Sequence, residues 1–225
     1  MTTQMQGPAG AVTVINGRPY DYFCGCGYLG LQSHPAVLAA AAEALAQYGL
    51  STATSRGGYG EHPVYEELEA QARLTLGCER LLYFASGYMG AAILAQSDLR
   101  AGDHFFLDES APFSQWDAAA MSNHAVSTFK HLDPESLSDR LKAELQPGER
   151  PLLLTDGLFP ISGEIAPLPR YLEVLRRYRG TLIVDDAHAF GVLGAHGRGS
   201  LEHFGVSGED CLCTATFNKA MGGFG

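Results

Sequence analysis

Apolar and amphipathic stretches alternate along most of this chain. Apolar stretches with the length of buried strands occupy residues 80–84, 104–108, 125–130, 151–156, 181–186 and 211–217. Stretches with helical spacing lie between them, at 86–99, 114–121, 133–145 and 168–178, and Asp133 is placed to cap the third. This alternation predicts an α/β domain with a largely parallel sheet.

The first 77 residues predict a different organisation. Residues 1–30 read as an arm with one short extended piece at 11–17. Two helices follow, at 33–49 and 63–77, and a glycine-rich loop at 51–62 joins them. Ser33 is expected to cap the first helix, and glycines end both.

Composition and charge narrow the class of protein. The chain has 225 residues, of which 46% are hydrophobic, so a sizeable core can form. A net charge of −10 disfavours nucleic acid and anionic membranes as partners. No apolar run reaches the roughly 18 residues of a membrane span, and the N-terminus lacks a signal-peptide pattern. We therefore expect a soluble, cytoplasmic protein.

The five cysteines include two C-x-C pairs, Cys24 with Cys26 and Cys211 with Cys213. C-x-C differs from the C-x2-C spacing of strong zinc signatures. The sequence around Cys211 alternates like a strand, so we expect these cysteines to pack in the core and predict no metal site.

Polar residues follow several predicted strands. In parallel α/β sheets the ligand binds beyond the carboxyl ends of the strands, so these residues are candidates for chemistry. Gly87 and Tyr88 open a helix after the stretch 80–84, where backbone N–H groups can bind phosphate, although a plain tight turn has the same pattern. Asp156 and Lys219 also follow predicted strands, and Lys219 is one of only three lysines.

The segment "VDDAH" allows three interpretations. Asp185 and His188 are too few to complete a metal site, and either could simply cap local structure. A carboxylate can also keep a pyridine nitrogen protonated, as an electron sink requires. Lys219 favours the third interpretation, because lysine is the usual Schiff-base nucleophile.

Six segments together resemble the α-oxoamine synthase family of pyridoxal 5′-phosphate (PLP) enzymes. They are "YLGLQSHPAV", "TSRGGYGEHPVYEELE", "YFASGYMG", "TDGLFPISGEIAPL", "LIVDDAHAFGVLGAHGRGS" and "TATFNKAMGGFG". The resemblance runs from about Tyr28 onward and implies the aspartate aminotransferase fold, fold type I of the PLP-dependent transferases. It divides the chain into an arm with the first helix, residues 1–50, and a large PLP-binding domain, residues 51–225. It also implies a C-terminal domain that these residues do not include.

The resemblance implies roles for several residues. Lys219 corresponds to the lysine that forms the Schiff base with PLP, and Asp185 to the partner of the pyridine nitrogen. His188 corresponds to the donor to the phenolic oxygen of the ring. For the phosphate it implies Thr216 on one side and Gly87 with Tyr88 on the other.

The sequence departs from the family pattern around the ring. The family's "D-x-x-x-H-A-S" is here "DESAPFS", so Pro112 takes the histidine position and Phe113 follows it. Asp156 replaces a glutamate and Pro160 a serine near the cofactor. Because aromatic rings stack well, we predict that Phe113 or Pro112 lies against the PLP ring.

The implied reaction is an acyl transfer. A small amino acid condenses with an acyl-CoA or acyl-carrier-protein thioester, loses CO2 and gives an α-amino ketone. Two alternatives stay open: another reaction of the same fold, such as transamination, and a weakly active partner subunit. The resemblance also implies a homodimer, with the loop at 54–62 near the neighbour's cofactor.

Overall fold

The computed structural model describes residues 2–225, which form two compact units. One unit comprises Ser86–Thr216 and the other Met1–Ala85 together with Phe217–Gly225. The boundary expected after residue 50 stays a prediction.

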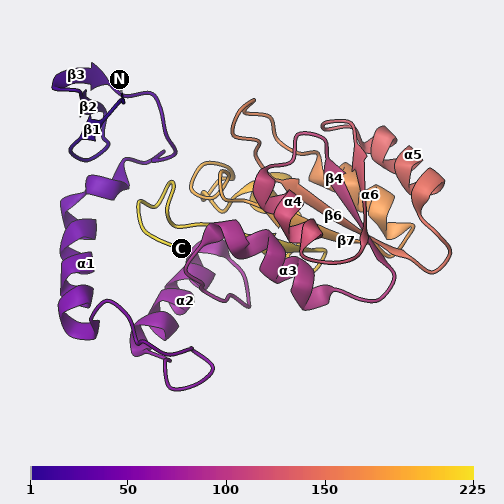
Figure 1. Ribbon diagram of the computed structural model, residues 1–225, viewed down its shortest axis with the longest axis horizontal. Helices are drawn as coiled ribbons and strands as arrows, with labels where there is room; N and C mark the ends of the chain where they lie inside the picture. Colours follow the sequence, from indigo (N-terminus) through magenta and orange to yellow (C-terminus); the bar gives the residue numbers. More distant parts are fainter. Residues whose placement is uncertain (1) are drawn as a thin grey trace. The chain divides into compact units, whose positions relative to one another are not determined.

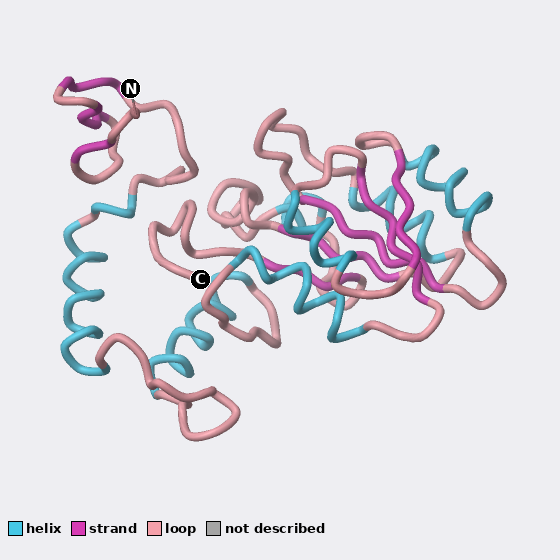
Figure 2. Tube along the Cα trace, in the orientation of Figure 1, coloured by secondary structure: helices cyan, strands magenta, loops and turns pink. Residues whose placement is uncertain are grey.

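The unit Ser86–Thr216 is built on a five-stranded sheet whose neighbouring strands all run parallel (Figures 1 and 2). The strand order is β5-β4-β6-β7-β8, with bounds β4 Asp103–Asp108, β5 Ala125–Phe129, β6 Arg150–Asp156, β7 Thr181–Asp185 and β8 Cys211–Thr214. The predicted parallel α/β sheet is confirmed, because the short apolar stretches form its central strands.

Helices cover both faces of this sheet (Figure 1). One face carries α3 and α4, and the other α5, α6 and α7; their bounds are α3 Gly90–Asp98, α4 Phe113–Ala120, α5 Pro134–Glu144, α6 Leu168–Arg176 and α7 Ser200–Phe204. Asp133 caps α5 as predicted, since its carboxylate accepts from the backbone N–H groups of Glu135 and Ser136.

Alternation along the strands produces two cores. In β4, Phe105 and Leu107 pack with the alanines of α3 and α4, whereas Phe106 packs on the opposite face. Successive side chains of a strand point to opposite faces, so an apolar strand fills both cores. The core on the face covered by α5 and α6 contains the larger side chains, and Tyr171 of α6 is fully buried in it.

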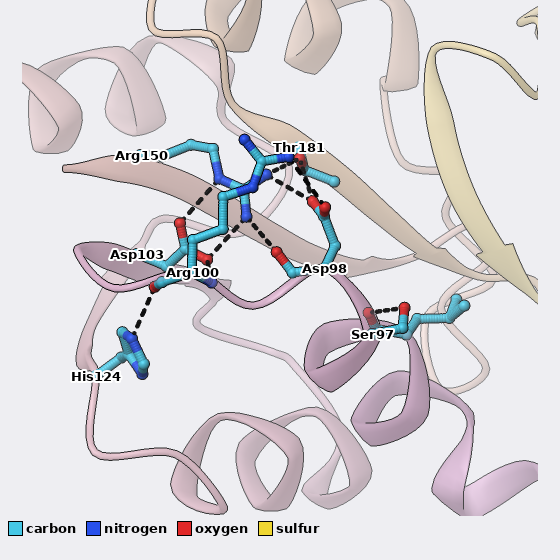
Figure 3. Close-up of polar contacts among 8 residues, drawn as sticks. Ser97, Asp98, Arg100, Asp103, His124, Arg150 and Thr181 are labelled. Carbon is cyan, nitrogen blue, oxygen red and sulfur yellow. Dashed lines mark hydrogen bonds and ion pairs between the residues drawn. The ribbon is translucent and has the colours of Figure 1, made fainter. Parts of the chain in front are cut away.

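Arg150 ties together the amino edge of the sheet (Figure 3). Its guanidinium donates to Asp98 at 2.6 Å, to Asp103 at 2.8 Å and to Thr181 at 3.1 Å. These partners come from the end of α3 and the starts of β4 and β7. The network therefore joins three elements at the end of the sheet opposite the strands' carboxyl termini.

The other unit begins with a small antiparallel sheet and contains two helices. Its elements are β1 Met5–Gln6, β2 Val12–Ile15, β3 Arg18–Asp21, η1 Leu31–Ser33, α1 Pro35–Tyr48 and α2 Pro63–Leu76. Gly49 and Gly77 end the two helices as predicted. The expected cap Ser33 is wrong, because Ser33 lies in η1 and the ring of His34 accepts from Ala36 N instead.

The strand predicted at 80–84 does not form. The carboxylate of Glu69 accepts the N–H of Tyr83 at 2.8 Å, and Arg56 donates to the Tyr83 carbonyl at 3.0 Å. These side chains thus form hydrogen bonds with the backbone groups of Tyr83 that a neighbouring strand would otherwise pair with. Leu82 is also exposed, so this stretch lacks the burial of the central strands β4, β6 and β7.

The two cysteines of β8 differ in burial. Cys211 is buried in the core, as expected, but Cys213 is exposed on the edge strand β8, so that half of the expectation was wrong. Within residues 2–225, no helix combines the length and the apolar character needed to cross a membrane, and no cluster of His, Cys, Asp and Glu side chains is suited to a metal ion.

Candidate functional site at the carboxyl edge of the sheet

Polar side chains gather where the parallel strands end. In register, Asp156 at the end of β6 stands beside Asp185 at the end of β7, and Asp185 stands beside Thr214 of β8. Asp156 and Thr214 are buried, and Asp185 is half-buried. The unit thus places two of the predicted site residues, Asp156 and Asp185, side by side.

Gly87 and Thr216 form a close contact at this edge. Gly87 lies in η2, Gly87–Met89, directly before α3, and a Cβ atom added to it would meet Thr216 Oγ1 at 3.0 Å. Thr216 is 2% exposed. A Cβ atom on Gly90 would overlap Thr214 in the same way. Glycines therefore let the start of α3 approach the end of β8, and backbone N–H groups at a helix start favour anions.

The loop after β7 is held by a buried carboxylate. Asp186 accepts from the backbone N–H of Ser200 at 2.8 Å and from its hydroxyl at 2.5 Å. Burial raises the pKa of Asp186 to about 6, and the hydrogen bonds from Ser200 oppose this shift. A Cβ atom on Gly157 or Gly199 would collide with the Asp186 carboxylate. Asp186 thus anchors both ends of the loop rather than standing open to a ligand.

A second carboxylate fixes the middle of this loop. Glu202 accepts from the backbone N–H groups of His196 at 2.9 Å and Arg198 at 3.1 Å. Desolvation raises the pKa of Glu202, but the hydrogen bonds from the backbone of His196 and Arg198 and from the His196 ring together outweigh it and lower the pKa to about 2. Asp185 Oδ1 accepts from Ala187 N at 2.9 Å, and His188 is half-buried one residue later. The predicted site residues Asp185 and His188 therefore sit at the base of an ordered loop.

The start of α4 follows the carboxyl end of β4, at the same edge of the sheet. Pro112 is the N-cap of α4 and Phe113 its first residue. Phe113 is 82% exposed, so it does not belong to the core. The hydroxyl of Tyr88 donates to Asp117 of α4 at 2.5 Å, and this contact raises the pKa of Tyr88. The predicted phosphate residue Tyr88 is thereby linked to the helix that carries Pro112 and Phe113.

Gln115 was not predicted as a site residue. Its side chain is 1% exposed and its Nε2 donates to Asp156 Oδ1 at 2.6 Å. Gln115 shares the buried face of α4 with Ala118 and Ala119. A glutamine three and four residues before two buried alanines is a sequence pattern that could have revealed it.

Asp108 and His131 form a second unpredicted pair. Asp108 is fully buried at the end of β4, and its carboxylate contacts His131 Nδ1 at 2.7 Å and the N–H of Leu132 at 2.9 Å. The other ring nitrogen of His131 lies 3.4 Å from Glu164, in the segment that follows Asp156. Asp108 also accepts from Ser110 N at 2.8 Å. One carboxylate thus orders the turn into α4 and the loop after β5.

Lys219 lies in the other unit, three residues beyond Thr216 in the chain. Its carbonyl accepts from Gly222 N at 3.1 Å, and Gly223 N donates to the Phe217 carbonyl at 2.7 Å, so the segment turns back on itself. The role of Lys219 stays a prediction, as do the roles of the other site residues.

Known proteins resemble this chain over nearly its whole length. The family described as "Aminotransferase class I and II" matches residues 24–225. An 8-amino-7-oxononanoate synthase of Nitrosospira multiformis is 38% identical over 221 residues, 98% of this chain and 55% of that protein. The same enzyme of Trichlorobacter lovleyi is 39% identical over 94% of this chain and 54% of its own length. The chain thus spans little more than half the length of the curated relatives it matches.

Solved structures show the same fold. A serine palmitoyltransferase from S. paucimobilis with a bound PLP–myriocin aldimine superposes with a TM-score of 0.91 at 28% identity, covering 99% of this chain and 56% of that one. An 8-amino-7-oxononanoate synthase from Francisella tularensis superposes with a TM-score of 0.75 at 27% identity, covering 90% of this chain and 56% of its own.

Proposed function

Because the chain belongs to the aminotransferase class I and II family, we propose that it is the cofactor-binding part of a PLP-dependent acyltransferase of the α-oxoamine synthase type. The fold expected from the sequence, fold type I of the PLP-dependent transferases, is confirmed. The proposed reaction condenses a small amino acid with an acyl-CoA or acyl-carrier-protein thioester, with loss of CO2, to give an α-amino ketone. A cytoplasmic location and a homodimer are part of this proposal.

The observation that carries the proposal is the contact of Gly87 with buried Thr216, which follows the end of β8 next to β7. A glycine that admits a threonine hydroxyl at a helix start suits a phosphate group, so these residues fit PLP. Asp185, one strand away from Thr214, suits the pyridine nitrogen.

Each residue then has a role in binding or proton handling. Thr216 and the N–H groups at Gly87 and Tyr88 hold the phosphate, and Lys219 supplies the amine that attaches the cofactor. Asp185 keeps the proton on the ring nitrogen, and His188 donates to the phenolic oxygen. PLP, when bound, supplies the electron sink that stabilises a carbanion on the amino acid.

Transamination is the second candidate. Pro112 caps α4 at the position where the resembling family has a histidine, and a proline side chain carries no proton to transfer. The absence of an acid–base group at this position is compatible with a reaction other than acyl transfer. Release of free CoA and CO2 supports the acyltransferase, whereas formation of a keto acid without CoA release supports transamination.

The cofactor assignment is tested by borohydride reduction of the purified full-length protein after incubation with PLP. We expect a stable adduct on the peptide that contains Lys219 and none in Lys219→Ala. Lys142→Ala is the matched control, because Lys142 is an exposed lysine paired with Asp139. An equal adduct in Lys219→Ala would overturn the lysine assignment.

A further inference from the structure

Gln115 makes a buried hydrogen bond to a carboxylate of the candidate site. Its Nε2 lies 2.6 Å from Asp156 Oδ1, and the side chains are 1% and 4% exposed. The amide nitrogen must face the carboxylate, since a carboxylate accepts and an amide oxygen cannot donate. This orientation leaves Gln115 Oε1 buried and without a partner among residues 2–225.

An unpaired buried amide oxygen lowers stability, so packing alone does not explain a glutamine here. The neighbours Ala118 and Ala119 are apolar, and a leucine of similar size would leave no orphaned oxygen. The benefit of the glutamine therefore lies in its bond to Asp156. Hydrogen bonds to charged groups are stronger than those between neutral groups.

The bond also joins two parts of the site. Gln115 belongs to the first turn of α4, two residues after Phe113, and Asp156 ends β6 beside Asp185 in register. On its exposed side, α4 is held by the hydroxyl of Tyr88 on Asp117. The start of α4 is thus fixed to the sheet by one buried bond and to η2 by one exposed bond.

We propose that Gln115 is a positioning residue of the cofactor site, which fixes the Asp156 carboxylate and, with it, the first turn of α4. This inference rests on the proposed function. It explains how an aspartate can serve at position 156, where the resembling family has the longer glutamate: the glutamine reaches the shorter carboxylate and holds it in place.

The test measures PLP affinity of the full-length protein by absorbance titration. Gln115→Leu removes the donor while keeping the volume, and we expect the Kd for PLP to rise about tenfold or more, as for a lost bond to a charged group. Asp156→Ala removes the acceptor and should weaken binding at least as much. The double variant Gln115→Leu/Asp156→Ala should bind PLP no more weakly than Asp156→Ala alone, because either change already removes the bond between the two side chains.

Gln115→Glu provides a readout that a packing role would not change. When protonated, a glutamate at 115 can donate to Asp156; when ionised, it repels that carboxylate. Relative to wild type, its PLP affinity should be close at pH 6 and fall about tenfold by pH 8.5. Ser122→Ala is the control, since it removes a bond from the Ser122 hydroxyl to the Ala119 carbonyl at the other end of α4.

The outcomes separate the two proposals. Wild-type protein that binds no PLP overturns the proposed function and the role of Gln115 with it. Wild-type protein that binds PLP, with additive losses in the double variant or a pH-independent Gln115→Glu, overturns the positioning role alone. If Gln115→Leu fails to fold, the pH profile of Gln115→Glu decides the question by itself.

Discussion

Ser200 donates two hydrogen bonds to Asp186, one from its backbone N–H at 2.8 Å and one from its hydroxyl at 2.5 Å. Asp186 is 2% exposed, and burial raises its pKa to about 6 from the usual 3.8. The folded state therefore binds this proton more tightly than the unfolded state. Stability from this group is present below about pH 4 and is lost as the pH rises to about 6.

We predict that Asp186→Asn abolishes this pH dependence. An amide can accept from the Ser200 N–H and donate to its hydroxyl without becoming charged. Between pH 4 and pH 7 the wild type should lose on the order of 2–3 kcal/mol relative to the variant, measured by urea unfolding at each pH. Ser200→Ala should extend the loss to higher pH, because the carboxylate then lacks the hydroxyl donor and keeps only the backbone N–H. Parallel pH profiles for wild type and Asp186→Asn would contradict the prediction.

Asp185→Asn should separate cofactor binding from catalysis. An asparagine oxygen can still accept from Ala187 N, so the loop after β7 keeps its local structure. A neutral amide cannot hold the proton on a pyridine nitrogen, so carbanion chemistry should fall by several orders of magnitude. Turnover and borohydride-fixed PLP are measured on the same sample. Near wild-type turnover would exclude this role for Asp185.

Phe113 or Pro112 is expected to lie against the cofactor ring, with Phe113 favoured because its side chain is exposed at the start of α4. Stacking contributes about 0.5–1.5 kcal/mol beyond burial, so Phe113→Ala should weaken PLP binding roughly 2- to 13-fold. Phe113→Tyr keeps the ring and should bind normally. A PLP-bound structure with neither residue within about 4.5 Å of the ring would end the stacking hypothesis.

Pro112→His tests the chemistry at the same position. If the enzyme follows the family reaction, the added acid–base group should raise the rate of CoA release. A lower rate on the true substrate would instead show that proline is an adaptation to different chemistry.

Arg150→Met should destabilise the protein strongly. Asp103, with its side chain 1% exposed, would lose its ion pair with the guanidinium and remain buried and charged (Figure 3). Loss of one partner of such a pair costs about 3–5 kcal/mol in the free energy of unfolding, measured with urea. Arg140→Met is the control, because Arg140 forms an exposed helical pair with Glu144 that contributes about 0.3–0.5 kcal/mol. Equal effects of the two changes would refute the prediction.

The loop at 54–62 should take part in a homodimer. Arg56 in this loop forms ion pairs with Glu61 at 2.5 Å and Glu69 at 2.7 Å. The side chain of Tyr59, also in the loop, is fully exposed. Tyr59→Arg would place a charge at this position and should raise the dimer dissociation constant, as measured by sedimentation at micromolar concentration. A wild-type protein that is monomeric there and still turns over would contradict the dimer.

The sequence by itself determined the parallel α/β architecture, because apolar stretches such as 151–156 are buried on both faces and need no distant information to be recognised. It also determined the helix ends at Gly49, Gly77 and Asp133, since capping depends on local backbone chemistry. Specific motifs, above all "LIVDDAHAFGVLGAHGRGS", indicated the family.

Only the tertiary structure decided which polar residues meet. Gln115 and Asp156 are 41 positions apart, and Asp108 and His131 are 23 apart, so no local pattern shows that they are bonded. Residues 80–84 have the composition of a strand, yet Glu69 and Arg56 take the backbone groups of Tyr83. Strand formation needs a pairing partner, and hydrogen bonds between distant side chains need the fold that brings them together; both are properties of the folded chain rather than of any segment.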